Sequence, residues 1–140
     1  MKKYKLMIRL PKPFVDKRGS LLKIIDGNFS SCLKVKSKKG SIRANHYHKK
    51  DRHFCYVISG KILWFYKDRK KGAKTKCKIM KKNDLFFTPA MQEHMAYFLK
   101  NTTFLAFSTR KRSQFDYEKD LVRVNMNNYF EVIKLIKKYR

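Results

Sequence analysis

The four histidines of this chain fall into one short pattern. His46, His48 and His53 follow one another closely, and His94 comes after a separate turn at Pro89. In an extended strand alternate side chains face the same side, so His46 and His48 share a face. The neighbours of each histidine on its own face are small or apolar, as expected for groups that point into a barrel. The sequence therefore predicts that the four imidazoles meet inside a sandwich or barrel of strands.

These four side chains also form a candidate metal site. Imidazoles that converge in an apolar cavity would repel one another if all were protonated. Neutral rings around a divalent cation avoid that repulsion, so we expect His46, His48, His53 and His94 to bind one ion. An all-nitrogen set favours zinc, iron, nickel or copper over manganese or magnesium. The alternative is a barrel without metal, in which some histidines act as acid–base or hydrogen-bonding groups.

Most of the chain consists of short apolar or alternating segments separated by turns. This pattern predicts an all-β sandwich or barrel. The expected strands cover residues 21–25, 32–36, 54–58, 61–66, 75–80, 85–88, 94–99 and 103–107, with a lysine-rich hairpin loop at 67–74. Helical periodicity occurs near the end of the chain and predicts a C-terminal helix over about 127–139. We expect residues 1–140 to form a single domain.

The charge of the chain is strongly positive. Lys and Arg number 36 against 10 Asp and Glu, which gives a formal net charge of +26. Because the lysines are spread along the whole sequence and no recognition helix is evident, nucleic acid is not the expected partner. A positive field would still raise the local concentration of a small molecule that carries phosphate groups.

Apolar runs, the N-terminal residues and the cysteines indicate in which cellular compartment the protein is expected. No apolar run approaches the roughly 20 residues of a membrane span, and the N-terminal residues lack the pattern of a secretory signal. The cysteines, Cys32, Cys55 and Cys77, are odd in number and form no paired motif, which favours reduced thiols. We therefore expect a cytoplasmic protein without a membrane partner.

The histidine pattern resembles a known superfamily. Residues 40–60 and 83–94 match the two-part signature of the cupins, although most metal cupins have glutamate at the position of His53. Residues 16–21 and 43–49 further resemble the nucleotide-sugar cupins, namely the TDP-4-keto-6-deoxyhexose 3,4-ketoisomerases and the 4-keto-rhamnose 3,5-epimerases. The resemblance implies a cupin jelly-roll barrel with a C-terminal helix. It also implies a homodimer that exchanges N-terminal strands.

The same resemblance implies an activity and residue roles. These enzymes move a proton next to the ketone of a nucleotide-linked sugar. For this protein we expect the reaction to belong to surface polysaccharide biosynthesis. In them the residue that matches His46 is the usual base, and the arginines that match Arg18 and Arg43 contact the diphosphate. Alternatively, Arg18 braces its own turn and Arg43 is a surface charge.

A metal would change the assignment of the base. The isomerases and epimerases generally work without metal, and a metal-bound His46 could not also be a free base. Tyr47, Tyr56, Glu93 or a metal-bound hydroxide would then move the proton, and Tyr47 is the residue we single out. Two other functions stay open: a metal-dependent dioxygenase-type cupin, and a non-catalytic module that binds a sugar or a metal.

Overall fold

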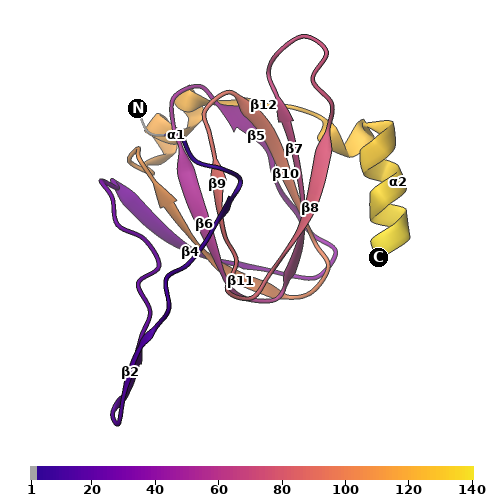
Figure 1. The fold of residues 1–140 in the computed structure, drawn as a ribbon. Coiled ribbons are helices and arrows are strands. Elements are labelled where there is room, and N and C mark those ends of the chain that lie inside the picture. The colour runs from indigo at the N-terminus through magenta and orange to yellow at the C-terminus, as the bar shows by residue number, and fades with distance from the viewer. Residues whose placement is uncertain (1–2) are drawn as a thin grey trace.

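The computed structural model describes residues 3–140, which fold into two facing β-sheets that form a barrel (Figure 1). All strand pairs are antiparallel. One sheet contains, in spatial order, β1 (Met7–Ile8), β9 (Leu85–Thr88), β6 (His53–Ser59), β11 (Thr102–Ser108) and β4 (Ser31–Ser37). The other contains β12 (Leu121–Arg123), β5 (Ile42–His48), β10 (Gln92–Phe98), β7 (Lys61–Asp68) and β8 (Lys76–Lys81). The predicted all-β fold is confirmed.

The apolar run of β7 explains how the barrel is covered on both sides. Ile62 and Trp64 pack in the core between the sheets, against side chains of β6, β9 and β10. Leu63 and Phe65 alternate with them and pack on the outer face, in a cluster that includes Val132 of the C-terminal helix. A strand buried on both faces reads as a continuous apolar run, as this one does.

Residues 3–140 include two α-helices, and the sequence predicted one of them. The C-terminal helix is confirmed as α2 (Phe130–Tyr139), preceded by a 3₁₀ turn, η1 (Met126–Asn128). Helix α1 (Gln114–Asp120) was not predicted. It has no buried residue and therefore no apolar stripe, so its sequence carries little helical periodicity. Within residues 3–140, no helix is long and apolar enough to cross a membrane.

The N-terminal part differs from the prediction. The expected strand at 21–25 is wrong beyond Leu21, because residues 22–30 form no strand and Ile24 and Ile25 pack on the core from a loop. Strands β2 (Phe14–Asp16) and β3 (Gly19–Leu21) pair in a separate hairpin that extends away from the barrel (Figure 1).

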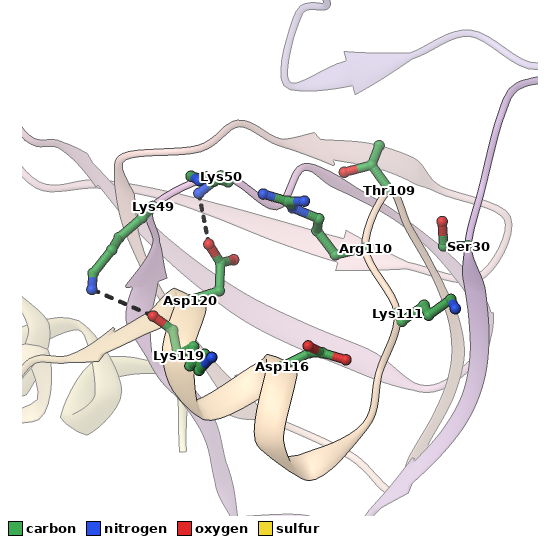
Figure 2. Close-up of a pocket in the computed structure, with 9 residues that line it drawn as sticks. All are labelled: Ser30, Lys49, Lys50, Thr109, Arg110, Lys111, Asp116, Lys119 and Asp120. Carbon is green, nitrogen blue, oxygen red and sulfur yellow. Dashed lines mark hydrogen bonds between the residues drawn. The ribbon is translucent and has the colours of Figure 1, made fainter.

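Three segments meet at one end of the barrel. They are the turn after β5, the segment after β11 and helix α1, and together they line a cavity of about 610 Å³ (Figure 2). A second cavity, of about 330 Å³, lies between the two sheets and contains all four histidines in its wall. The last residue of α1, Asp120, lines the first cavity and contacts His48, which lines the second.

Candidate functional site

The structure brings all four histidines together inside the barrel. His46 and His48 come from β5, His53 from the start of β6 and His94 from β10. The ring centroids of His46 lie 4.7 Å from His48 and 4.8 Å from His94, and those of His53 and His94 lie 5.2 Å apart. All four side chains are buried. The predicted meeting of the imidazoles is thus confirmed as a spatial arrangement.

Within this cluster, three histidines form a tight set. Ligating atoms of His46, His48 and His94 all lie within 4.8 Å of one another. His53 stands at the edge, where its atoms group with those of His48 and Asp51 instead. His53 thus borders this set, with its ring centroid 5.2 Å from that of His94 and 5.4 Å from that of His48.

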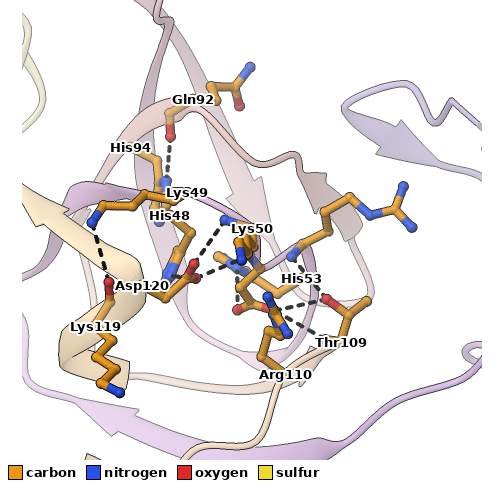
Figure 3. Close-up of polar contacts among 12 residues, drawn as sticks. His48, Lys49, Lys50, His53, Gln92, His94, Thr109, Arg110, Lys119 and Asp120 are labelled. Atoms are coloured by element: carbon orange, nitrogen blue, oxygen red, sulfur yellow. Dashed lines mark hydrogen bonds and ion pairs between the residues drawn. The ribbon is translucent and has the colours of Figure 1, made fainter. Parts of the chain in front are cut away.

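In two histidines of the tight set, one ring nitrogen already lies at hydrogen-bond distance from a protein oxygen (Figure 3). The Nδ1 of His48 lies 3.1 Å from Oδ2 of Asp120, and the Nδ1 of His94 lies 2.9 Å from the carbonyl oxygen of Gln92. With the proton on Nδ1, each ring presents Nε2 as an unprotonated ligand. A carboxylate or carbonyl that orients an imidazole in this way is the usual outer partner of a metal-bound histidine.

The remaining nitrogen of His94 has no partner. Its Nε2 is fully buried and makes no hydrogen bond to any of residues 3–140. Nε1 of Trp64, whose ring stacks on His94 at 5.3 Å between centroids, is likewise buried without a partner among them. Such groups are costly unless a ligand or a cation satisfies them. The donor set and the unsatisfied Nε2 both fit a divalent transition metal.

His53 belongs to a different hydrogen-bonded group. Its Nδ1 lies 3.7 Å from Oδ2 of Asp51, whose Oδ1 accepts bonds of 3.1 Å from the backbone N–H and the hydroxyl of Thr109. Burial by itself raises the pKa of Asp51, but the bonds and charges of His53, His48 and Thr109 outweigh it and leave the pKa below its ordinary value. Asp51 is thus a carboxylate beside the imidazole at the edge of the cluster.

The surroundings keep the tight set neutral. Burial, followed by the charges of His48 and His53, lowers the pKa of His46 from 6.5 to about 3. Burial and His53 also lower the pKa of His48 to about 4, although Asp51 and Asp120 act in the opposite direction. Burial is the main reason why the pKa of His94 lies well below 6.5. Neutral imidazoles are the form that binds metals.

The rest of the cavity wall is mostly apolar, with polar groups added by few residues. Cys55 lies in this wall, and burial raises the pKa of its thiol to about 12, so that the thiol stays protonated. Tyr117 of α1 lies near the rings of His46 and His48, at 6.0 and 5.9 Å between centroids. The guanidinium of Arg112 stacks on Tyr117 at 4.2 Å.

Arg43 reaches this cavity because β5 contains an extra residue. Ala44 and Asn45 have φ angles of 64° and 65°, and the pairing of β5 with β10 shifts register there. Such a bulge re-aims the side chains before it. Asn45 accepts a 2.8 Å bond from the backbone N–H of Met126, and Arg43 lines the histidine cavity. Nε of Arg43 donates a 2.6 Å bond to the hydroxyl of Ser37, which fixes its position.

Arg18 is not brought to the histidines of its own chain. It lies at the turn of the β2–β3 hairpin, with its side chain 81% exposed. Its guanidinium donates hydrogen bonds to Asp16, two residues away. In a single chain Arg18 therefore braces its own turn, the alternative that the sequence left open.

The three candidate proton donors also lie elsewhere. Tyr47 faces away from the histidine cavity, and the guanidinium of Arg69 lies 4.7 Å from its ring centroid. Tyr56 donates a bond to Asn83, and Glu93 binds Arg69 on the outer face. The strand alternation that places each histidine inward places its immediate neighbour outward, so Tyr47 does not line this cavity, and this position does not support the catalytic role predicted for it.

Sequence reasoning missed four residues of the site, which are Asp51, Arg112, Tyr117 and Asp120. Three of them belong to α1 or to the segment before it, which carries no signal of its position relative to the barrel. Asp51 could have been found, because an acidic residue two positions before His53 can accept a bond from its ring.

Comparisons with known proteins give matches among solved structures alone. A scan against protein-family models and a search of curated sequences each find no match. The sugar 3,4-ketoisomerase QdtA from Thermoanaerobacterium thermosaccharolyticum, solved with TDP, is 16% identical and matches with a TM-score of 0.68 over 96% of each chain.

Two further structures are similar. A 3,4-ketoisomerase from Helicobacter canadensis is 16% identical with a TM-score of 0.66, and the match covers 90% of this chain and 92% of that one. For the dTDP-4-dehydrorhamnose 3,5-epimerase from Sulfolobus tokodaii the values are 22% identity, a TM-score of 0.63 and coverage of 76% and 71%. The chain therefore has the cupin jelly-roll fold of these sugar-nucleotide enzymes, as its histidine pattern predicted.

Proposed function

We propose that this protein is an isomerase or epimerase that acts on a 4-keto sugar linked to a nucleoside diphosphate. The observation that carries the proposal is the histidine cavity itself, in which imidazoles with oriented nitrogens meet at an apolar pocket of about 330 Å³. Similar structures are ketoisomerases and epimerases of such sugars, and one was solved with TDP. We assign the reaction to the cytoplasm and to the synthesis of surface polysaccharides.

We further propose that His46, His48 and His94 hold a divalent transition metal. Their ligating atoms lie close together, and Asp120 and the Gln92 carbonyl orient two of the rings. The chemistry that such an ion supplies is polarisation of a ketone oxygen, which makes the adjacent C–H more acidic. As a ligand His46 has no free nitrogen for proton transfer, so the proposed base is a different residue.

His53 is the proposed proton-transfer residue. It lies at the edge of the tight set and still lines the cavity. Its Nδ1 faces Asp51, so its Nε2 is the nitrogen left to take a proton from the carbon next to the ketone. The Asp51 carboxylate, held by Thr109, would stabilise the imidazolium that forms and would orient the ring for return of the proton.

The substrate would be held by polar groups in the cavity wall. Arg43 supplies a guanidinium whose orientation is fixed by Ser37, and guanidinium binds phosphate oxygens well. The partnerless Nε1–H of Trp64 can donate a hydrogen bond to a sugar oxygen. Arg18 would reach a cavity only in a second copy of the chain, which is consistent with the proposed homodimer.

Solvent exchange tests the activity directly. The protein is incubated with TDP-4-keto-6-deoxyglucose and TDP-4-keto-rhamnose in deuterated water, and the sugar protons are followed by NMR. We expect a ring-carbon proton next to the carbonyl to be replaced by deuterium only when the protein is present. If several 4-keto nucleotide sugars bind without any labelling, the chain is a non-catalytic binding module. Oxygen uptake with a thiol or diketone substrate, without labelling, would favour the dioxygenase instead.

A further inference from the structure

The larger of the two cavities is strongly basic (Figure 2). Its wall includes five cationic side chains from three separate segments. Two come from the turn after β5, two from the segment after β11 and one from α1, namely Lys49, Lys50, Arg110, Lys111 and Lys119. These segments are distant in sequence, so the fold itself gathers the charges around a hollow of about 610 Å³.

The two acidic residues in the wall, Asp116 and Asp120, offset only part of this charge, since they face five cations. Oδ1 of Asp120 accepts a bond from the backbone N–H of Lys50, and Oδ2 accepts from the N–H of Asp51 and faces His48. The carboxylate of Asp116 accepts a bond from the hydroxyl of Ser113. Both carboxylates thus serve to hold local structure.

The cationic heads are left without acidic partners. Across residues 3–140, none of the five cations forms an ion pair with a carboxylate. Nζ of Lys49 lies 3.4 Å from the carbonyl oxygen of Lys119, and Nζ of Lys119 lies 4.0 Å from the ring centroid of Phe115. Uncompensated like charges around one hollow cost free energy unless an anion shares it.

We propose that this cavity is a binding site for the phosphate groups of a small molecule, separate from the histidine cavity. Lysine and arginine donors suit phosphoryl oxygens, and Ser30 in the same wall adds a hydroxyl donor. The charges line a bounded hollow and not an extended stripe, so the site fits a phosphate or diphosphate better than a polynucleotide. The proposal does not depend on the reaction assigned to the histidines.

An occupied site would also hold helix α1 in place. The helix has no buried residue, and its contact with the barrel depends on polar groups such as Asp120 and on the bond between Arg123 and Glu118. An anion bound between Lys119 on α1 and Lys50 or Arg110 on the barrel side would link the two. We therefore expect ligand binding to slow local opening of residues 114–120.

The test uses inorganic pyrophosphate as the probe, titrated by calorimetry at about 150 mM salt, where diffuse attraction is screened. The cavity variant is Lys50→Ser with Lys111→Ser. The control is Lys78→Ser with Lys82→Ser, which removes the same charge from exposed positions on and beside β8. A third protein, Arg43→Ser, reports whether the probe binds in the histidine cavity instead.

We expect saturable binding that weakens about tenfold or more in the cavity variant and less than about twofold in the control. Binding at Arg43 in the histidine cavity, which the proposed function implies, would be a separate event that Arg43→Ser removes and the cavity variant keeps. We also expect slower amide hydrogen exchange of residues 114–120 when pyrophosphate is present. Equal weakening in the cavity and control variants would show a diffuse charge effect and overturn the site. Loss of all pyrophosphate binding in Arg43→Ser would place the probe among the histidines and overturn the site. Saturable binding of an oligonucleotide but not of pyrophosphate would assign the surface to nucleic acid. A failed deuterium-labelling experiment, by contrast, would leave this site unaffected.

Discussion

In three of the four histidines an oxygen atom faces Nδ1 of the imidazole. His48 faces the Asp120 carboxylate and His94 faces a backbone carbonyl, so both can present an unprotonated Nε2 to a cation. His53 faces Asp51 from outside the tight set. The oxygens that face Nδ1 favour the same tautomer in His48, His53 and His94, so position in the cluster, and not the tautomer, separates the two proposed roles.

Metal content tests the ligand set. His94→Gln removes the buried Nε2 from the proposed ion, and we expect the purified protein to lose most of its metal in elemental analysis. Asp120→Asn keeps every ligand but weakens the orientation of His48, so its metal affinity should fall about 10- to 100-fold. Tyr47→Phe, on the outer side of β5, serves as the control and should leave the content unchanged. Equal metal content in all four proteins would contradict the assignment.

The lowered pKa values also predict how stability depends on pH. In the metal-free protein the pKa values of His46 and His48, about 3 and about 4, lie below the 6.5 of an unfolded chain. The unfolded state then binds more protons as the pH falls below 6.5, so stability is complete above that pH and is lost on acidification toward 4 and then 3. We expect a loss on the order of a few kcal/mol between pH 7.5 and pH 4.5.

Urea unfolding of chelator-treated protein measures this effect. The double variant His46→Gln with His48→Gln is the control, because it removes the two groups and should show a flatter pH dependence. An unfolding free energy of the wild type that stays constant from pH 7.5 to 4.5 would mean that these rings titrate normally in the folded state.

At the scale of the elements, alternation made the strands and their inward faces predictable. The period of two places His46 and His48 inside, and the same rule places Tyr47 outside, so its position away from the cavity could have been predicted from the sequence. The bulge at Asn45 could not have been foreseen, because it depends on bonds with Met126, far along the chain. Helix α1 escaped prediction because it packs no apolar face.

A buried carboxylate holds the C-terminal segment to the barrel. Glu93 is 2% exposed, and it accepts a 3.0 Å bond from Arg69 and a 2.7 Å bond from the hydroxyl of Tyr129, just before α2. Burial, followed by the bond to Glu93, raises the pKa of Tyr129 to about 12, so the tyrosine remains a donor.

Removal of this charge should loosen the segment. We expect Glu93→Gln to lower the free energy of unfolding by about 1–3 kcal/mol, because two bonds to a buried carboxylate are weakened. The matched control is Glu118→Gln, which breaks an exposed pair with Arg123 and should cost clearly less, because a solvent-exposed ion pair contributes little. Urea denaturation compares the two, and equal losses would show that Glu93 contributes no more than a surface charge.

At the scale of the whole molecule, the protruding β2–β3 hairpin is the feature that a single chain leaves unexplained. Phe14, Val15 and Leu21 on it are 60%, 69% and 71% exposed. A two-stranded hairpin that exposes apolar side chains is seldom stable by itself in water. This supports the proposal that two copies of the chain exchange their N-terminal strands. Arg18 at its turn would then be delivered to the partner.

Light scattering after size exclusion tests the homodimer. We expect the wild type at twice the 16.9 kDa chain mass, and Val15→Asp with Leu21→Asp at the mass of one chain with unchanged circular dichroism. Lys12→Ser with Lys17→Ser changes charge on the same hairpin without removing apolar surface, and it should remain dimeric. A wild type that is monomeric at all concentrations would rule out the exchange.

The overall architecture was predictable because the spacing of the histidines, read with strand periodicity, fixes two motif strands around one point. Assignments that depend on contacts between distant segments were not predictable. Asp120 contacts His48, and Lys50 lines one cavity with the segment after β11, through tertiary packing that no local pattern encodes. The basic cavity therefore could not be predicted from the sequence, in which its lysines look like scattered surface charges.

The central claim is that His53 transfers the proton. It is tested most directly by the rate of deuterium incorporation into TDP-4-keto-6-deoxyglucose, measured for wild type, His53→Gln and Lys78→Ser. We expect His53→Gln to lower this rate by about 10²- to 10⁴-fold, which is the usual contribution of a general base. Lys78→Ser should catalyse the exchange at the wild-type rate. Exchange by His53→Gln at the wild-type rate, with the metal content of the two proteins equal, would contradict the claim.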